Sequence, residues 1–184
     1  MRQLSRWLQL GMVGLIGFVW PVMASAFSGD IKNDPSQLVE KYLSLDKRGA
    51  RLEVSSHDVL TPFVSWNEEP AWGRIVVISD FRVIEDVTQW EVLSSSEVLI
   101  PVTFTVIGTV YWETATFLPE SQIYLEFFHV KAIHERWRIV APQLPPHVGK
   151  SRLVNFIRLA QSQEVDERRK KRLQSLQAQV KQAQ

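Results

Sequence analysis

Three side chains on two of the predicted strands could perform acid–base catalysis, and Asp80 is the first. Asp80 lies in the middle of a strand predicted over residues 74–84, where a charge is disfavoured unless it is solvated or paired. If Asp80 faces a pocket, desolvation raises its pKa toward that of a general base. Asp80 also shares its side of the strand with Arg74 and Arg82, and this spacing favours a solvated Asp80–Arg82 ion pair on the outer face.

His129 and Tyr124 are the other two candidates, and both belong to a strand predicted over residues 122–133. A histidine in a pocket could donate or accept a proton, with a tyrosine as hydrogen-bond donor. The sequence supplies no partner that would orient the imidazole of His129. A histidine satisfied by a neighbouring carbonyl is therefore the simpler interpretation.

Aromatic side chains could line a site for a small apolar ligand, because such sites combine apolar walls with few polar groups. The candidates are Trp66, Trp72, Trp112 and Trp137. The same residue types also build ordinary hydrophobic cores, and a core is the simpler interpretation.

Several kinds of chemistry are excluded by what the sequence lacks. There is no cysteine, which excludes disulfides, thiolate metal ligands, a cysteine nucleophile and a lipid attached to a cysteine. The four histidines show no H-x-x-H or H-x-x-x-H spacing, so no metal site is predicted. The sequence contains no G-x-S-x-G elbow and no phosphate-binding glycine loop, and we predict no cofactor.

The first 26 residues are typical of a secretory signal peptide. Arg2 and Arg6 precede an apolar run from Leu10 to Trp20, and the small residues Ala24-Ser25-Ala26 follow. The apolar run is shorter than the roughly 20 residues that a spanning helix needs. We therefore expect cleavage after Ala26 and export to the periplasm of a two-membraned bacterium, with an uncleaved inner-membrane anchor as the alternative.

Composition indicates one domain followed by a tail. The chain has an apolar fraction of 45% and seven tryptophans, of which five lie in a domain predicted over residues 27–148 and supply its core. Residues 149–184 form a helical, basic and glutamine-rich tail in this interpretation. Without the signal peptide the acidic and basic side chains nearly balance, so no global nucleic-acid footprint is present.

Hydrophobic periodicity predicts an α+β fold in which N-terminal helices precede a curved sheet. A first helix begins at Pro35 and ends at Gly49, and a short second helix runs from Ser55 to about Val64. The predicted strands span residues 74–84, 98–112, 122–133 and 136–141, and a C-terminal helix spans residues 150–162. The long strand alternates between an apolar and a half-apolar face, which favours an antiparallel sheet covered on one side. Gly108 marks a bulge or bend in that strand.

Residues within these elements also carry a family resemblance. The pattern Pro35-x-x-Leu38-Val39-x-x-Tyr42-Leu43-x-Leu45-Asp46-x-x-Gly49-Ala50-x-Leu52 is followed by Trp66, Pro70-x-Trp72 and Trp137-Arg138-Ile139-x-x-Pro142. Together they resemble the nuclear transport factor 2-like superfamily, and in particular its small exported bacterial members. The resemblance covers residues 34–145 and implies a cone, formed by a strongly curved antiparallel sheet around the N-terminal helices. It does not choose an activity, because the superfamily includes isomerases, dehydratases, transport adaptors, secretion-system assembly domains and binding modules.

The tail combines a basic cluster with a thin apolar seam. The cluster consists of Arg168, Arg169, Lys170, Lys171 and Arg172, and the seam of Leu173, Leu176 and Val180. In one interpretation the tail is a solvated helix that hangs free of the domain. In the other it is a docking segment, whose cluster meets an anionic surface or partner while its seam packs against another helix.

The function that these features favour is that of an exported, non-catalytic binding or assembly module of the bacterial cell envelope. Its expected partners are a small apolar ligand or an envelope protein, and a homodimer through the open sheet face. One alternative is an isomerase or dehydratase that uses Asp80 or His129 as base. Another is a secretion-apparatus subunit anchored by its uncleaved N-terminus. No nucleic-acid partner is expected, and membrane contact is expected only through the signal peptide or the basic tail.

Overall fold

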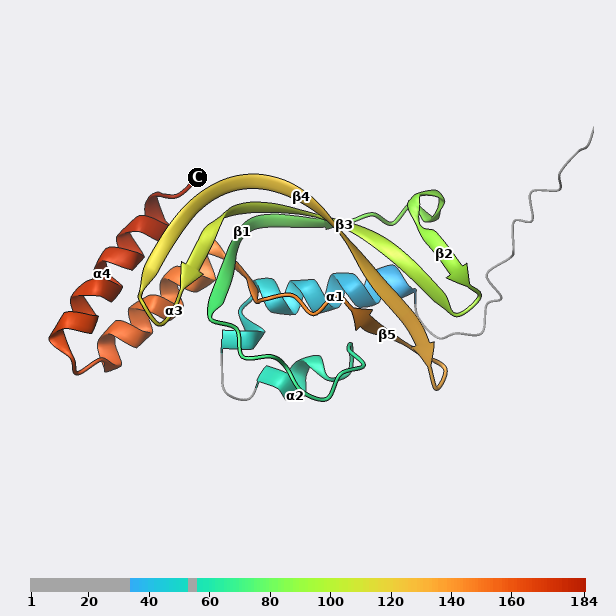
Figure 1. Ribbon diagram of the computed structural model, residues 1–184, viewed down its shortest axis with the longest axis horizontal. Helices are drawn as coiled ribbons and strands as arrows, with labels where there is room; N and C mark the ends of the chain where they lie inside the picture. The colour runs from blue at the N-terminus through green and yellow to red at the C-terminus, as the bar shows by residue number, and fades with distance from the viewer. Residues whose placement is uncertain (1–33, 53–55) are drawn as a thin grey trace, which may run out of the picture.

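A strongly curled, six-stranded mixed sheet arches over a single long helix (Figure 1). The computed structural model describes residues 34–52 and 56–184, so the predicted signal peptide lies outside the described residues. The strand order is β5-β4-β3-β1-β6, and β2 pairs with β3. The strands are β1 (Arg74–Val83), β2 (Glu91–Ser94), β3 (Glu97–Tyr111), β4 (Thr116–Ile133), β5 (Arg136–Ala141) and β6 (His147–Gly149). The helices are α1 (Pro35–Lys47), α2 (Ser56–Leu60), α3 (Lys150–Gln163) and α4 (Glu167–Gln182).

The predicted α+β class and strong curvature are confirmed, but the sheet is mixed rather than wholly antiparallel. β6 runs parallel to β1, with Val76 opposite His147. It was not predicted because a three-residue strand directly after two prolines has too few residues for a periodic pattern. The short strand β2 was also not predicted, and β4 begins at Thr116 instead of residue 122.

The predicted bend at Gly108 is confirmed. The register between β3 and β4 shifts between Val106 and Gly108, and the register between β1 and β3 shifts nearby. Gly108 has a φ of 155°, and a Cβ atom there would overlap the Phe117 ring and lie 2.6 Å from the Leu118 carbonyl oxygen. Only glycine fits this close approach, which divides the sheet into two halves.

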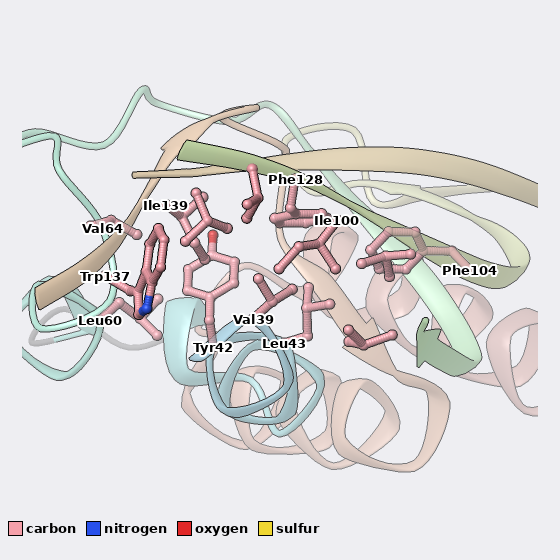
Figure 2. Packing of buried hydrophobic residues seen from close by; sticks show 14 of the residues in the cluster. Val39, Tyr42, Leu43, Leu60, Val64, Ile100, Phe104, Phe128, Trp137 and Ile139 are labelled. Carbon is pink, nitrogen blue, oxygen red and sulfur yellow. The ribbon is translucent and has the colours of Figure 1, made fainter. Parts of the chain in front are cut away.

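Helix α1 fills the concave side of the first half of the sheet. Asp34 caps it by accepting hydrogen bonds from the backbone N–H and the hydroxyl of Ser36. Val39, Tyr42 and Leu43 form an apolar stripe on α1, and each is at most 3% exposed. Figure 2 shows these three side chains directed at Ile100, Phe104 and Phe128 of the sheet and at Trp137. The interior of the arch is therefore a packed core.

Helix α2 is shorter than predicted, because the chain turns at Leu60 instead of continuing to Val64. The backbone N–H of Ile139 donates to the carbonyl oxygen of Phe63, and that of Ser65 donates to the carbonyl oxygen of Ile139. Val64 thereby forms a parallel bridge with Ile139 of β5. Pairing with a strand edge replaces the helical hydrogen bonds of this segment.

The C-terminal segment does not hang free, which corrects the first interpretation of the tail. The seam residues Leu173, Leu176 and Val180 are at most 1% exposed, and they share a second hydrophobic cluster with Leu153 and Ile157 of α3. Figure 1 shows α3 and α4 side by side at the far end of the sheet. The seam packs against another helix as the docking interpretation expected, but that helix belongs to the same chain.

Candidate functional site

Asp80 lies on the outer surface of β1, with 72% of its side chain exposed. Its carboxylate accepts a hydrogen bond from the Lys47 ammonium group at 2.6 Å, so the ion pair forms with Lys47 and not with Arg82 as predicted. The correction arises because the C-terminus of α1 lies close to β1, a contact that strand spacing alone cannot show. The hydrogen bond from Lys47 lowers the pKa of Asp80, which is opposite to the shift that a general base requires.

His129 has an orienting partner that sequence reasoning did not identify. Its Nε2 atom lies 2.6 Å from a carboxylate oxygen of Glu97, at the start of the neighbouring strand β3. His129 is opposite Leu99 and Asp80 is opposite Thr105 along β3. Six residues of strand separate these two positions by about 20 Å. The structure therefore does not bring Asp80 and His129 together.

Tyr124 points to the inner face of the sheet and forms a hydrogen bond with a buried histidine, His147. The Tyr124 hydroxyl lies 2.5 Å from Nε2 of His147, and Nδ1 of His147 lies 2.7 Å from the Pro145 carbonyl oxygen. Because a carbonyl can only accept, Nδ1 carries the proton, and Nε2 accepts from the tyrosine. Desolvation lowers the pKa of His147 to about 4 and raises the pKa of Tyr124 to about 12. The pair is therefore uncharged at neutral pH.

Behind His147 lies a buried ionic network centred on Arg51. The guanidinium donates two hydrogen bonds to the Asp46 carboxylate at 2.9 and 2.6 Å, a third to Glu69 and two more to the carbonyls of Leu144 and Pro145. Asp46 also accepts from the backbone N–H of His147 at 2.9 Å. The Asp46 and Arg51 side chains are only 1% and 2% exposed. These bonds fasten the end of α1 to the segment that places β6 on β1, so we interpret the network as structural.

Sequence reasoning did not assign this network, although Asp46 belongs to the quoted Leu-Asp-x-x-Gly pattern. The signal that the sequence offers is the acidic side chain of Asp46 on the apolar side of the predicted helix. Arg51 and His147 had no comparable signal. The contact between Asp46 and His147 joins residues that are 101 positions apart.

The predicted ligand-pocket tryptophans do not line one cavity. Trp137 is 2% exposed within the first core, and Trp66 packs against that core. Trp112 belongs to the second core, where its ring lies 4.9 Å from the ring of Phe156. Trp72 is half-buried, and its Nε1 atom is buried without a hydrogen-bond partner among the residues that the structure describes.

The basic cluster on α4 is partly occupied by contacts within the chain. Arg169 forms an ion pair with Glu164 at 3.1 Å and donates a hydrogen bond to the carbonyl oxygen of Glu113. Lys170 lies 3.7 Å from Glu167. The exposed members of the cluster are Arg168, Lys171 and Arg172.

A cleft of about 540 Å³, lined by both apolar and cationic side chains, is a candidate binding site. It opens between α1, the loop after α2 and the β4–β5 hairpin. Its apolar surface comes from Leu38, Pro62, Phe63 and Trp137, and its polar surface from Gln37, Lys41, His134, Glu135, Arg136 and Arg138.

The charge of this cleft is predominantly positive. Lys41, Arg136 and Arg138 contribute cationic groups, whereas Glu135 is the acidic residue of the lining. No ion pair between residues in the described part of the chain involves any of these three cations. Arg138 donates one hydrogen bond to the Trp137 carbonyl oxygen at 3.0 Å. A ligand can therefore contact the cationic groups of the cleft without breaking an ion pair among the described residues.

The hairpin turn beside the cleft has an uncommon backbone. His134 and Glu135 have φ values of 48° and 61°, and neither is glycine. Two successive residues with positive φ match the two-residue turn that suits the twist of paired strands, a turn in which Asn and Gly are preferred. The turn joins the strands predicted over residues 122–133 and 136–141, and it places the His134 and Glu135 side chains in the lining of the cleft.

Comparison with protein-family models, curated proteins and solved structures found no match to this chain. Within residues 34–52 and 56–184, no group of three or more His, Asp or Glu side chains is placed to hold a metal ion. No helix in the same part of the chain is long and apolar enough to cross a membrane.

Proposed function

We propose that this chain is a non-catalytic binding module of the bacterial cell envelope that holds an acidic, partly apolar segment of another envelope protein in the cleft between α1 and the β4–β5 hairpin. The observation that carries the proposal is the cleft itself, whose lining combines three cations with apolar side chains. Such a surface complements a peptide in which carboxylates alternate with apolar side chains.

A second observation supports binding at the surface rather than a reaction inside the arch. The concave side of the sheet is filled by Tyr42, Phe104, Phe128 and Trp137, none more than 3% exposed. The side chains considered for proton transfer lie on different faces or far apart on one face. An external cleft is therefore the better candidate for ligand contact.

The curled sheet over α1 supports membership of the nuclear transport factor 2-like superfamily as part of this proposal. The helix–strand order and the burial of Val39, Tyr42 and Leu43 of α1 agree with the cone that the resemblance implies. Because members of the superfamily differ in activity, the fold does not choose a function for this chain. The proposed binding function therefore rests on the cleft.

A binding measurement with matched charge variants tests the cleft. The probe is a fluorescein-labelled peptide of alternating Glu and Leu, followed by fluorescence anisotropy. The double variant Lys41→Glu, Arg136→Glu reverses two exposed charges of the cleft, and Lys171→Glu, Lys181→Glu makes the same change of net charge on α4. We expect at least about a tenfold loss of affinity in the cleft variant and less than about a twofold loss in the α4 variant.

Two results would contradict binding in the cleft. An equal loss of affinity in both variants would show that only the net charge attracts the peptide. Equal affinity of the unaltered protein for a peptide of alternating Lys and Leu would remove the acidic specificity.

Export is tested separately by mass spectrometry of the protein recovered from periplasmic and membrane fractions. We expect a periplasmic species that begins at Phe27. A species that begins at Met1 and is confined to the membrane fraction would favour the anchored secretion-apparatus subunit.

A further inference from the structure

Strand β4 has a bare edge along the front of the arch (Figure 1). One side of β4 pairs with β3, and the other side pairs with β5 only from His129 to Ile133. No described strand pairs with that second side over residues 121–128. This stretch contains no proline or lysine, the residues that commonly protect an exposed strand edge.

The backbone of this edge is oriented for pairing. Pro101 lies opposite Phe127, and its carbonyl oxygen accepts a hydrogen bond from the backbone N–H of Ile84 at 3.0 Å, away from β4. Pro101 and Phe127 are therefore a non-hydrogen-bonded pair, and the backbone groups of Phe127 point to the bare edge. The Phe127 N–H accordingly donates to the Glu126 side chain at 3.3 Å. Because the register is continuous here, Leu125 and Ile123 have the same orientation.

The same three residues form an apolar stripe on the outer face of the sheet. Ile123, Leu125 and Phe127 are 71%, 53% and 44% exposed. Each of them thus presents to the edge backbone groups that no described strand pairs with, and to solvent an apolar side chain. An added strand would satisfy the backbone groups and cover part of the stripe.

We propose that this edge binds the same edge of a second copy of the chain, in antiparallel orientation, with the two-fold axis at Leu125. In this register Leu125 lies opposite itself, and Ile123 lies opposite Phe127 of the second copy. All three apolar residues then have an apolar cross-strand neighbour, and aromatic–β-branched pairs stabilise sheets. Glu126 lies opposite Tyr124 of the second copy, so no like charges are opposed.

Every neighbouring register is less favourable. An axis at residue 126 opposes two Glu126 carboxylates, which repel each other. An axis at residue 123 or 124 places Phe127 opposite Pro119 or Ser121. An axis at residue 127 places Leu125 opposite His129 of the second copy, and His129 already pairs with Ala141 of β5 on this side of the strand. The chain is therefore self-complementary in one register, which favours a second copy over an unrelated strand.

The oligomeric state of the full chain tests the proposal. By sedimentation velocity we expect a dimer whose population rises with concentration. Leu125→Arg places two cations opposite each other at the axis and should give a monomer at concentrations where the unaltered chain is dimeric. Leu159→Arg is the matched control, because Leu159 is similarly exposed, at 55%, on α3; it should remain dimeric. Circular dichroism verifies that both variants are folded.

Cysteine crosslinking tests the register, and the absence of native cysteine makes each engineered thiol unique. Opposed residues of a hydrogen-bonded antiparallel pair have Cα atoms about 5.5 Å apart, a spacing that a disulfide can bridge. Under mild oxidation Leu125→Cys should form a covalent dimer rapidly. Ile123→Cys should do so at least about tenfold more slowly, because its opposite residue is Phe127.

Three results would overturn the proposal. The first is that the unaltered chain stays monomeric at all accessible concentrations, which would leave the edge to a strand of another protein. The second is that Leu125→Arg remains dimeric, which would place the interface elsewhere. The third is that Ile123→Cys crosslinks faster than Leu125→Cys, which would contradict the register that places Leu125 at the axis.

Discussion

Acid should destabilise this protein through one buried imidazole, that of His147. His147 is 2% exposed, and burial lowers its pKa to about 4 in the folded state, whereas an unfolded histidine titrates near 6.5. Above pH 6.5 neither state binds the proton, so the group contributes no pH dependence. Between pH 6.5 and 4 the unfolded state binds one more proton, and the free energy of unfolding falls by about 1.4 kcal/mol per pH unit. The total loss at pH 4 is about 3 kcal/mol.

Urea denaturation followed by tryptophan fluorescence at pH 7.5, 6.5, 5.5 and 4.5 measures this loss. His147→Asn keeps an amide donor near the position of Nδ1 but loses the ring and its hydrogen bond with Tyr124, so its free energy of unfolding should be lower at pH 7.5. Because asparagine cannot titrate, that free energy should fall less steeply as the pH falls. The control His134→Asn changes an exposed turn residue with positive φ, a backbone that asparagine tolerates, and should keep the steeper slope. Parallel pH profiles for the unaltered chain and His147→Asn would refute the reasoning, as would a ring that titrates near pH 6.5 by NMR.

Three further substitutions test the packing by urea or thermal denaturation. Leu176→Ala should cost about 2–5 kcal/mol of unfolding free energy, because Leu176 lies fully buried on the face of α4 that packs against the second hydrophobic cluster. Leu159→Ala on the exposed surface of α3 should cost less than about 0.5 kcal/mol, and equal costs would mean that α4 does not pack. Gly108→Ala should cost about 1–3 kcal/mol from its clash and strained φ, whereas Gly73→Ala, with open space around it, should be nearly neutral. Asp46→Asn should cost about 3–5 kcal/mol by removing the buried one of the two carboxylates that pair with the Arg51 guanidinium; a cost below about 1 kcal/mol would contradict the buried network.

The elements that sequence predicted well are those with a long local pattern. The stripe of α1 and the alternation of β3 extend over enough residues for their periods to be recognised, and both faces are buried as expected. The bend at Gly108 was also predictable, because an isolated glycine within a strand pattern commonly marks a bulge or a close backbone approach.

What the sequence could not predict depends on contacts between distant residues. Strand β6 pairs with β1 directly after Pro146, whose carbonyl oxygen accepts a hydrogen bond from the Val76 backbone N–H. Hydrogen bonds from Arg51 to the Pro145 carbonyl and from the His147 N–H to Asp46 hold this segment in place. The cleft is assembled from three separate stretches of chain, so its cationic groups show no cluster in the sequence. Asp80 illustrates the opposite error, since local spacing suggested Arg82 but the packing of α1 supplied Lys47.

The division of the sheet at Gly108 explains why the surfaces left for binding lie outside the arch. Each half of the sheet has its own hydrophobic cluster, the first closed by α1 and the second by α3 and α4. A concave surface occupied on both sides of the bend leaves no interior for a ligand of appreciable size. The two proposed recognition sites accordingly lie at the rim, where α1 meets the β4–β5 hairpin, and at the edge of β4 over residues 121–128, with which no described strand pairs. Because β5 pairs with β4 only beyond residue 128, the edge and the cleft occupy successive parts of the same long strand and its hairpin.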